Sequence, residues 1–221
     1  MALPDLLKNT LKMPVVVAPM FLASGPQLVI ETCKAGSVGS FPSLNQRTAE
    51  GFEAWLTEIK AGLAQAKQEG LSVAPYAVNL IVHKSNPRLL DDLALVIKHQ
   101  VPIVITSLGI NTDVIAAVQS YGGLVFHDVI NMRFAQKALG ANVDGIVAVC
   151  AGAGGHAGTY NPFAFIRELR AITDKTILAS GCISEGASIL GAISCGADLA
   201  YMGSRFIVAE ESMVQSDYKD M

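Results

Sequence analysis

The chain has 221 residues, half of which (51%) are hydrophobic, and its formal net charge at pH 7 is −3. This length allows one large domain with a sizeable apolar core, and the scattered positive residues exclude a basic patch for nucleic acid. The longest apolar stretches, around residues 15–23 and 101–110, are shorter than the roughly 18 residues that a membrane-spanning helix requires. No export signal precedes them, so we expect a cytoplasmic protein without a membrane or nucleic-acid partner.

Short β-branched runs alternate with longer segments of helical period along the chain. Eight strands are predicted, and they begin near Pro14, Ser37, Pro75, Pro102, Gly123, Asp144, Thr176 and Asp198. Three of the intervening helices have N-terminal signals, at Asn86 with Pro87, Asn161 with Pro162, and Ser184 with Glu185. The clearest helix covers residues 48–68. Its apolar residues recur at spacings of three and four and predict one buried stripe: Phe52, Trp55, Leu56, Ile59 and Leu63.

Eight strand–helix repeats predict a parallel (β/α)8 barrel of the TIM type. A doubly wound sheet is the alternative, because it also alternates strands and helices. No GxGxxG motif follows the first strand, and the candidate functional residues follow many different strands. Both observations favour the barrel.

The four cysteines, Cys33, Cys150, Cys182 and Cys195, lie far apart and form no CxxC pair. No histidine stands at ligand spacing from them, so we expect no metal site. Disulfides are not expected either, because a chain of this size has a large core to stabilise it.

The most unusual segment is AGAGGHAG, residues 151–158, which follows the predicted strand GIVAV. Glycines destabilise helices and strands, so their density here indicates a backbone that turns sharply or approaches a bound group closely. The segment carries His156, whose side chain has a pKa near neutrality and suits a general base. A histidine bonded only to backbone groups in a turn is the alternative interpretation.

In a barrel, the loops that follow the strands converge on one face and form the site. This chain places a set of small and polar residues there: Ala18, Pro19, Met20, Asn79, His127 and Ser180. Barrels commonly bind phosphate after strands seven and eight, where Gly181, Gly203 and Ser204 lie. Ordinary tight turns would also explain these glycines.

Five segments, in this order over nearly the whole chain, resemble the nitronate monooxygenase family, formerly called 2-nitropropane dioxygenase. They are PVVVAPM (14–20), NLIVHKSN (79–86), AGAGGHAG (151–158), ASGCIS (179–184) and MGSRF (202–206). The resemblance implies an FMN-dependent barrel that oxidises alkyl nitronates, or nitroalkanes, with O2 to a carbonyl compound and nitrite. It also implies a homodimer by analogy.

The resemblance assigns roles to particular residues. The backbone of Ala18, Pro19 and Met20 would border the flavin ring, while Asn79 and His127 would contact its polar edge or ribityl chain. Relatives often carry a lysine in place of His127. The remaining assignments concern three groups of residues: Gly154, Gly155 and Ser180 are cofactor-binding residues; Gly181, Gly203 and Ser204 hold the phosphate; and His156 is the base or binds the nitro group.

His83 follows Asn79 and is a candidate for the substrate pocket, with an exposed loop histidine as the alternative. Members of the family continue past the MGSRF segment into a helical lid and a final helix, whereas this sequence stops at Met221. We therefore expect residues 1–221 to form one FMN-binding barrel domain without that lid.

Two other functions remain open. A flavin-dependent enoyl-acyl-carrier-protein reductase shares the glycine loop but consumes NAD(P)H. A non-redox barrel that binds a phosphorylated ligand would not bind flavin. Colour after incubation with FMN, and the requirement for a nicotinamide, distinguish the three functions.

Overall fold

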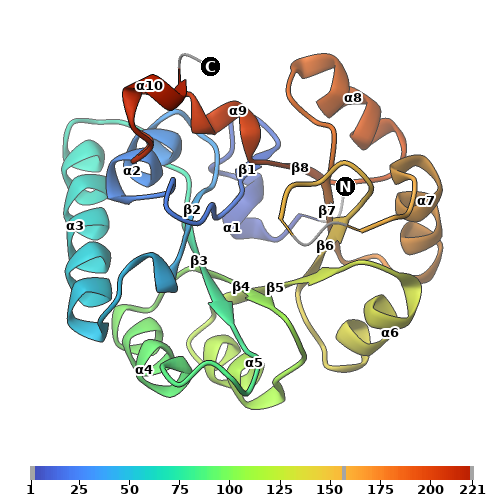
Figure 1. The fold of residues 1–221 in the computed structure, drawn as a ribbon, viewed down its shortest axis with the longest axis horizontal. Helices are drawn as coiled ribbons and strands as arrows, with labels where there is room; N and C mark the ends of the chain where they lie inside the picture. The colour runs from blue at the N-terminus through green and yellow to red at the C-terminus, as the bar shows by residue number, and fades with distance from the viewer. Residues whose placement is uncertain (1–2, 156–157, 220–221) are drawn as a thin grey trace.

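The computed structural model describes residues 3–155 and 158–219, which form a ring of parallel strands surrounded by helices (Figure 1). The strands are β1 Val15–Val17, β2 Gly39–Pro42, β3 Tyr76–Ile81, β4 Ile103–Ser107, β5 Leu124–Val129, β6 Gly145–Val149, β7 Thr176–Ser180 and β8 Leu199–Met202. All eight predicted strands are confirmed. Each begins close to its predicted start, because the β-branched runs that predict the strands are also the buried segments.

The strands follow one another around the ring in the order β1-β8-β7-β6-β5-β4-β3-β2, and every pairing is parallel. A bridge between Val16 and Val38 joins the two ends. The amide of Val17 donates to the carbonyl of Val38 at 2.8 Å, and the amide of Val38 donates to the carbonyl of Val15 at 3.0 Å. The sheet is therefore a nearly closed barrel, as predicted, and not a doubly wound sheet.

Seven longer helices surround the barrel in the described part of the chain: α2 Pro26–Lys34, α3 Ala49–Gln68, α4 Leu89–His99, α5 Thr112–Gln119, α6 Met132–Gly140, α7 Pro162–Ile172 and α8 Gly186–Ser194. Shorter turns are α1 Asp5–Lys8, η1 Ser43–Asn45, α9 Ser204–Ile207 and α10 Ser216–Lys219. Over residues 3–155 and 158–219, no helix is long and apolar enough to cross a bilayer.

The helix α3 confirms its predicted bounds and its buried stripe. The hydroxyl of Thr48 accepts a hydrogen bond from the amide of Gly51 at 3.1 Å and so caps the helix. Four stripe residues are buried and Trp55 is partly buried against the same core: Phe52, Leu56, Ile59 and Leu63. The stripe is therefore a packing surface.

The predicted N-terminal signals of the other helices have mixed outcomes. Asn161 caps α7 by accepting from the amide of Phe163 at 2.9 Å, as expected. Asn86 does not cap α4, which begins at Leu89. Its side chain instead closes a turn, donating to Ile81 and accepting from the amide of Arg88. At α8 the N-cap is Glu185 rather than Ser184. The same residue types cap helices and close turns, so the sequence alone does not distinguish the two roles.

The side chains of the strands divide into two apolar clusters. One fills the lumen of the barrel and includes Leu7 of α1: Leu7, Val16, Val38, Ala77, Ile103, Ile105, Phe126, Val147, Leu178 and Leu199. The other, which includes Val78, Val104 and Ile146, lies between the strands and the helices. Successive side chains of a strand point to opposite faces. A strand residue that belongs to the lumen cluster therefore shows that the residues two positions before and after it also face the lumen.

The substitution Gly39→Ala tests the close approach of α2 to β2. A methyl group at Gly39 would lie 2.6 Å from the carbonyl oxygen and 2.8 Å from the Cα of Val29, which are backbone atoms of α2. We expect this substitution to lower the free energy of unfolding by roughly 1–3 kcal/mol, because the helix must move outward. The measurement is the urea midpoint of unfolding.

The matched control is Gly191→Ala, inside α8, where the new methyl group meets open space. This variant should be neutral or more stable by about 0.5–1 kcal/mol, because alanine has the higher helix propensity. Equal midpoints for the two variants would contradict the packing argument.

Candidate functional site

Polar side chains from five strands meet at the C-terminal end of the lumen. They are Asn79 of β3, Ser107 of β4, Asp128 of β5, Ser180 of β7 and Tyr201 of β8. Each stands two residues after a member of the lumen cluster, so each faces inward. We call this set the lumen polar layer. It lies above an apolar lumen and opens at the face where barrels hold their active sites.

Asn79 is held rigidly within this layer. Its amide nitrogen donates to the carbonyl of Ile105 at 3.0 Å and to the hydroxyl of Ser107 at 2.8 Å. Its own carbonyl oxygen can accept a further hydrogen bond, and the hydroxyls of Ser180 and Tyr201 in the same layer can each donate one. Polar groups held in a barrel mouth with spare hydrogen-bonding capacity are groups that a ligand can satisfy.

The side chain of Tyr201, a member of the lumen polar layer, is a neutral phenol. Burial raises the pKa of Tyr201 well above its usual value, and the negative charge of Asp128 raises that pKa further. The hydroxyl therefore keeps its proton and can donate a hydrogen bond. Sequence reasoning missed both residues. The signal in the sequence was strand alternation: Asp128 shares the inward face with Phe126, and Tyr201 shares it with Leu199.

The loop after β1 is fixed beside the end of β8. The amide of Ala18 donates to the carbonyl of Met202 at 2.8 Å, and the side chain of Asn45 donates to the carbonyl of Met20 at 3.0 Å. A methyl group built on Gly203 would lie 3.6 Å from the sulfur of Met20 and 3.8 Å from the Cβ of Ala18. The structure thus brings these predicted residues together. Pro19 is half-buried between them.

The loops after β6 and β7 also pack against each other. Gly181 has a φ of +124°, and a methyl group there would lie 2.8 Å from the carbonyl oxygen of Ala151. Gly152 has a φ of +82°, and a methyl group there would collide with the sulfur of Cys182, which would have to move. Glycine is required at both positions, since each combines a left-handed backbone with a close approach.

The rest of the glycine loop is open to solvent. Gly154 and Gly155 are exposed, and a methyl group on either would meet nothing within 4 Å. Gly158 is buried, and a side chain there would collide with the carbonyl oxygen of Val149. The predicted base, His156, lies outside the described residues. Ser204 is exposed and begins α9.

His127 does not join the lumen polar layer. It alternates with Val125 and Val129, which belong to the outer cluster, and its Nδ1 lies 2.7 Å from the hydroxyl of Thr106. Burial lowers the pKa of His127 to about 4, although the contact with Thr106 opposes this shift. Strand alternation thus places His127 on the outer side of the barrel and gives the inward position to Asp128, and the flavin contact of His127 stays a prediction.

His83 is placed away from the layer as well. It is exposed in the loop after β3, and its Nδ1 lies 2.8 Å from the hydroxyl of Ser85. Asp144, at the start of β6, accepts hydrogen bonds from the amide of Val125 and from the side chain of Gln119. It links strands at the opposite end of the barrel from the site.

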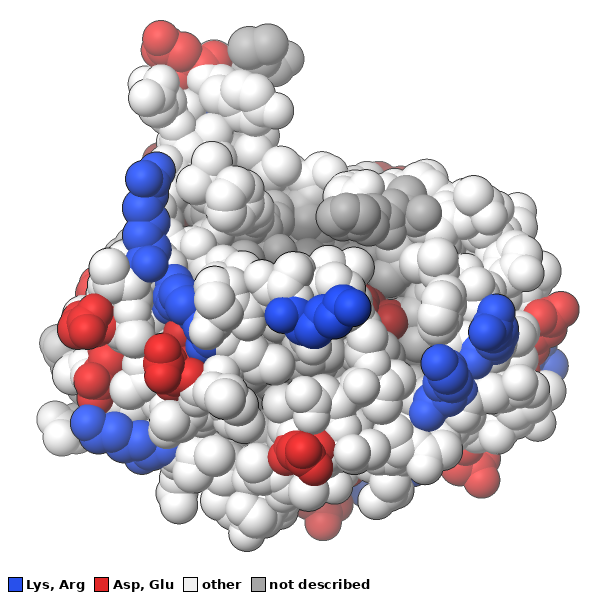
Figure 2. All heavy atoms as spheres, turned by 60° about the horizontal axis from the view of Figure 1, so that its bottom comes forward, with Lys and Arg blue, Asp and Glu red and all other residues white. Residues whose placement is uncertain are grey.

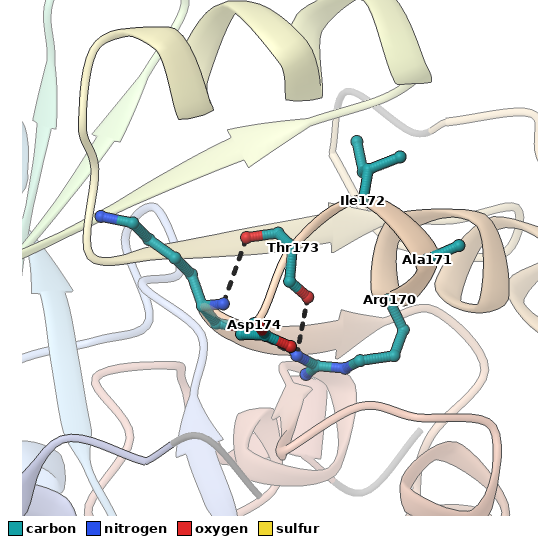
Figure 3. Close-up of a pocket in the computed structure, with 6 residues that line it drawn as sticks. Arg170, Ala171, Ile172, Thr173 and Asp174 are labelled. Atoms are coloured by element: carbon teal, nitrogen blue, oxygen red, sulfur yellow. Dashed lines mark hydrogen bonds between the residues drawn. The ribbon is translucent and has the colours of Figure 1, made fainter.

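A surface hollow of about 610 Å³ lies at that opposite end, along residues 170–175 between α7 and β7 (Figure 3). There Arg170 donates to the carbonyls of Thr173 and Lys175, each at 3.1 Å, and forms an ion pair with Asp198. The hollow is therefore lined by a guanidinium that already holds two loops together. We assign no catalytic role to the residues that line it.

The face seen in Figure 2 carries dispersed lysine and arginine side chains, and the hollow in its upper part is bordered mainly by uncharged residues. In the described part of the chain, no group of three His, Cys, Asp or Glu side chains is arranged to hold a metal ion. The chemical groups that the structure gathers are those of the lumen polar layer.

The sequence matches the family described as nitronate monooxygenase over residues 5–220. It is 26% identical to a nitronate monooxygenase from Paraburkholderia phytofirmans, covering 93% of this chain and 66% of the relative. It is 29% identical to one from Neurospora crassa (92% and 62%). It is also 26% identical to a (3aS,4S,5R,7aS)-5-hydroxy-7a-methyl-1-oxo-octahydro-1H-indene-4-carboxyl-CoA dehydrogenase from Rhodococcus jostii (93% and 55%). The chain thus spans 55–66% of the length of these relatives.

Solved structures share the fold. FabK from Thermotoga maritima superposes with a TM-score of 0.86 at 25% identity, covering 98% of this chain and 65% of that one. A nitroalkane oxidase from Streptomyces ansochromogenes gives the same TM-score at 22% identity, covering 98% and 72%. At that identity, the second likeness shows the fold alone.

The buried His127 predicts a dependence of stability on pH. Its pKa is lower in the folded chain (about 4) than in an unfolded chain (near 6.5), so folding favours the neutral ring. Its stabilising contribution is complete above pH 6.5 and is lost as the pH falls from 6.5 towards 4, by up to about 3 kcal/mol.

The measurement is the free energy of unfolding in urea at several pH values, for the wild type and for His127→Asn. The asparagine does not titrate, so the difference between the two proteins should shrink as the pH falls through this window. Carboxylates titrate alike in both proteins and cancel in the comparison. Parallel curves would show that the pKa of His127 is the same in the folded and the unfolded chain.

Proposed function

Because the chain belongs to the nitronate monooxygenase family, whose members are flavin-dependent oxidoreductases, we propose that it binds FMN at the C-terminal mouth of the barrel. We propose further that it oxidises alkyl nitronates, or nitroalkanes, with O2 to a carbonyl compound and nitrite. One observation carries the proposal: inward-facing polar side chains from five strands meet at the C-terminal mouth of the lumen, with Asn79 held by Ile105 and Ser107, beside loops rich in glycine.

The residues present fit a flavin. The polar edge of a flavin ring carries an N–H donor and carbonyl acceptors, and the ribityl chain carries hydroxyls. The carbonyl oxygen of Asn79 can accept from such donors, and the hydroxyls of Ser180 and Tyr201 can serve its acceptors. Gly203 lies beside Ala18 and Met20 and itself adds no side chain to that side of the mouth.

The phosphate belongs at the loops after β7 and β8. Gly181 has a positive φ and Gly203 bears no side chain, so both expose backbone in these loops. The exposed hydroxyl of Ser204 adds a donor. Barrels commonly bind phosphate at this place, where backbone N–H groups converge.

Bound FMN would supply the electron acceptor for the substrate and the site of reaction with O2. The chain would supply the proton chemistry. We assign His156 as the base that removes the proton from the carbon beside a nitro group. For a substrate that is already a nitronate anion, the same imidazole binds the nitro group.

The rim of the mouth suits the alkyl part of such a substrate. Exposed apolar side chains stand in the loops that follow the strands: Phe21, Leu22, Leu108, Ile130 and Tyr160. Apolar side chains placed around a polar site bind hydrocarbon and leave orientation to the few polar groups.

A second function is favoured by the likeness to FabK. An enoyl-acyl-carrier-protein reductase would use the same flavin site but would take hydride from NAD(P)H and act on an acyl chain. The two functions differ in their requirement for a nicotinamide, which an assay can measure directly.

The purified chain is expected to turn yellow with FMN and to keep the flavin through gel filtration. It should then consume O2 and release nitrite with propyl nitronate in the absence of NADH. Steady NADH consumption with a crotonyl thioester, without nitrite release from the nitronate, would favour the reductase. A protein that stays colourless after incubation with FMN would exclude both flavin functions and leave a non-redox ligand-binding barrel.

His156→Asn should keep bound FMN and lose turnover of neutral nitroalkanes by roughly 10²- to 10⁴-fold, the usual contribution of a general base. Turnover of a nitronate should fall less, because that substrate has already lost its proton. The measurement is kcat/KM for nitroethane and for ethyl nitronate at one pH. Unchanged activity on nitroethane would show that another group is the base.

A further inference from the structure

Asp128 is the acidic member of the lumen polar layer, and the mechanism above does not use it. It follows Phe126 of the lumen cluster by two residues, and in the register of the sheet it stands opposite Val147 of β6, which also faces the lumen. Its neighbour His127 pairs with Ile146 and Thr106 on the outer side. Two independent strand registers thus direct the Asp128 carboxylate into the mouth.

The other members of the layer are neutral amide or hydroxyl side chains: Asn79, Ser107, Ser180 and Tyr201. The charge of Asp128 acts across the lumen, since it contributes to the raised pKa of Tyr201 on β8. Asp128 is half-buried, which limits solvent screening, so its charge contributes to the potential where a ring that covers the mouth would rest.

We propose that Asp128 tunes the bound flavin, its negative charge favouring oxidised FMN over reduced FMN. This inference rests on the proposed function, because it requires FMN in the mouth. Reduction adds two electrons and one proton to the ring, which thereby gains one negative charge. A fixed carboxylate beside the ring opposes that gain, so Asp128 acts as a positioning and tuning residue.

The size of the effect follows from Coulomb's law. At an effective dielectric constant of about 20, one unit charge across the width of a barrel mouth changes the preference between two charge states by roughly ten- to a hundredfold. By linkage, this factor equals the change in the ratio of the dissociation constants of reduced and oxidised FMN.

The experiment measures those two dissociation constants for the full chain, with FMN and with dithionite-reduced FMN under anaerobic conditions. In Asp128→Asn, reduced FMN should bind at least about tenfold more tightly relative to oxidised FMN than in the wild type. Asp128→Ser is prepared in parallel as a second neutral variant, so that folding of either one permits the test.

Two variants serve as controls. Asp128→Glu keeps the charge and should stay within about threefold of the wild-type ratio. Asp174→Asn removes the same formal charge from the exposed loop after α7, at the other end of the barrel (Figure 3), and should leave the ratio unchanged. This control separates a local charge from a change in net charge.

The outcomes are distinct. If the wild type binds FMN but the neutral variants keep its ratio, Asp128 does not tune the flavin and the proposed function stands. If neither form of FMN binds to the wild type, the proposed function fails and this inference fails with it. A shift of equal size in Asp174→Asn would assign the effect to net charge and overturn the role of Asp128.

Discussion

The closure of eight parallel strands into one barrel is the constraint on which the remaining structure depends. The last step of that closure is small: Val16, Val17 and Val38 join β1 to β2 through one bridge and its hydrogen bonds. Once the ring is closed, every second side chain of each strand is committed to the lumen and the others to the helical layer. The chemistry of the mouth is therefore set by position within each strand.

This commitment gives neighbouring residues opposite environments. His127 is buried under the helices, where low polarity keeps its ring neutral, whereas Asp128 faces the mouth, where its charge reaches Tyr201. Strand register also determines the contacts of Asn79. Because β3 and β4 are in register, its amide nitrogen is held by the carbonyl of Ile105 and the hydroxyl of Ser107.

The glycines serve the same mouth through the backbone. Gly152 and Gly181 adopt positive φ angles so that the loops after β6 and β7 can lie against each other. The end of β8 at Gly203 lies beside Ala18 and Met20. Loops built this way expose backbone at the strand ends without filling the mouth, an arrangement that suits a flat, phosphorylated cofactor. The relatives named nitronate monooxygenase align with 92–93% of this chain in sequence.

Local chemistry in the sequence determined the elements of this fold. Apolar β-branched runs specify the eight strands, the spacing of Phe52, Leu56 and Ile59 specifies α3, and the ordered motifs specify the family. These features depend on neighbours within a few residues, so a sequence displays them directly. The grouping of Ala18, Met20 and Gly203 also followed, because barrel topology brings strand ends together.

Only the tertiary structure decided which residue of an adjacent pair faces the mouth. His127 and Asp128 both stand at the end of β5, and a shift of one residue in the register exchanges their environments. The register is fixed by pairing with β4 and β6, far away in sequence, and so the sequence pointed to the histidine while the fold selected the aspartate. The same holds for Tyr201, whose position in the lumen depends on the pairing of β8 with β1 and β7.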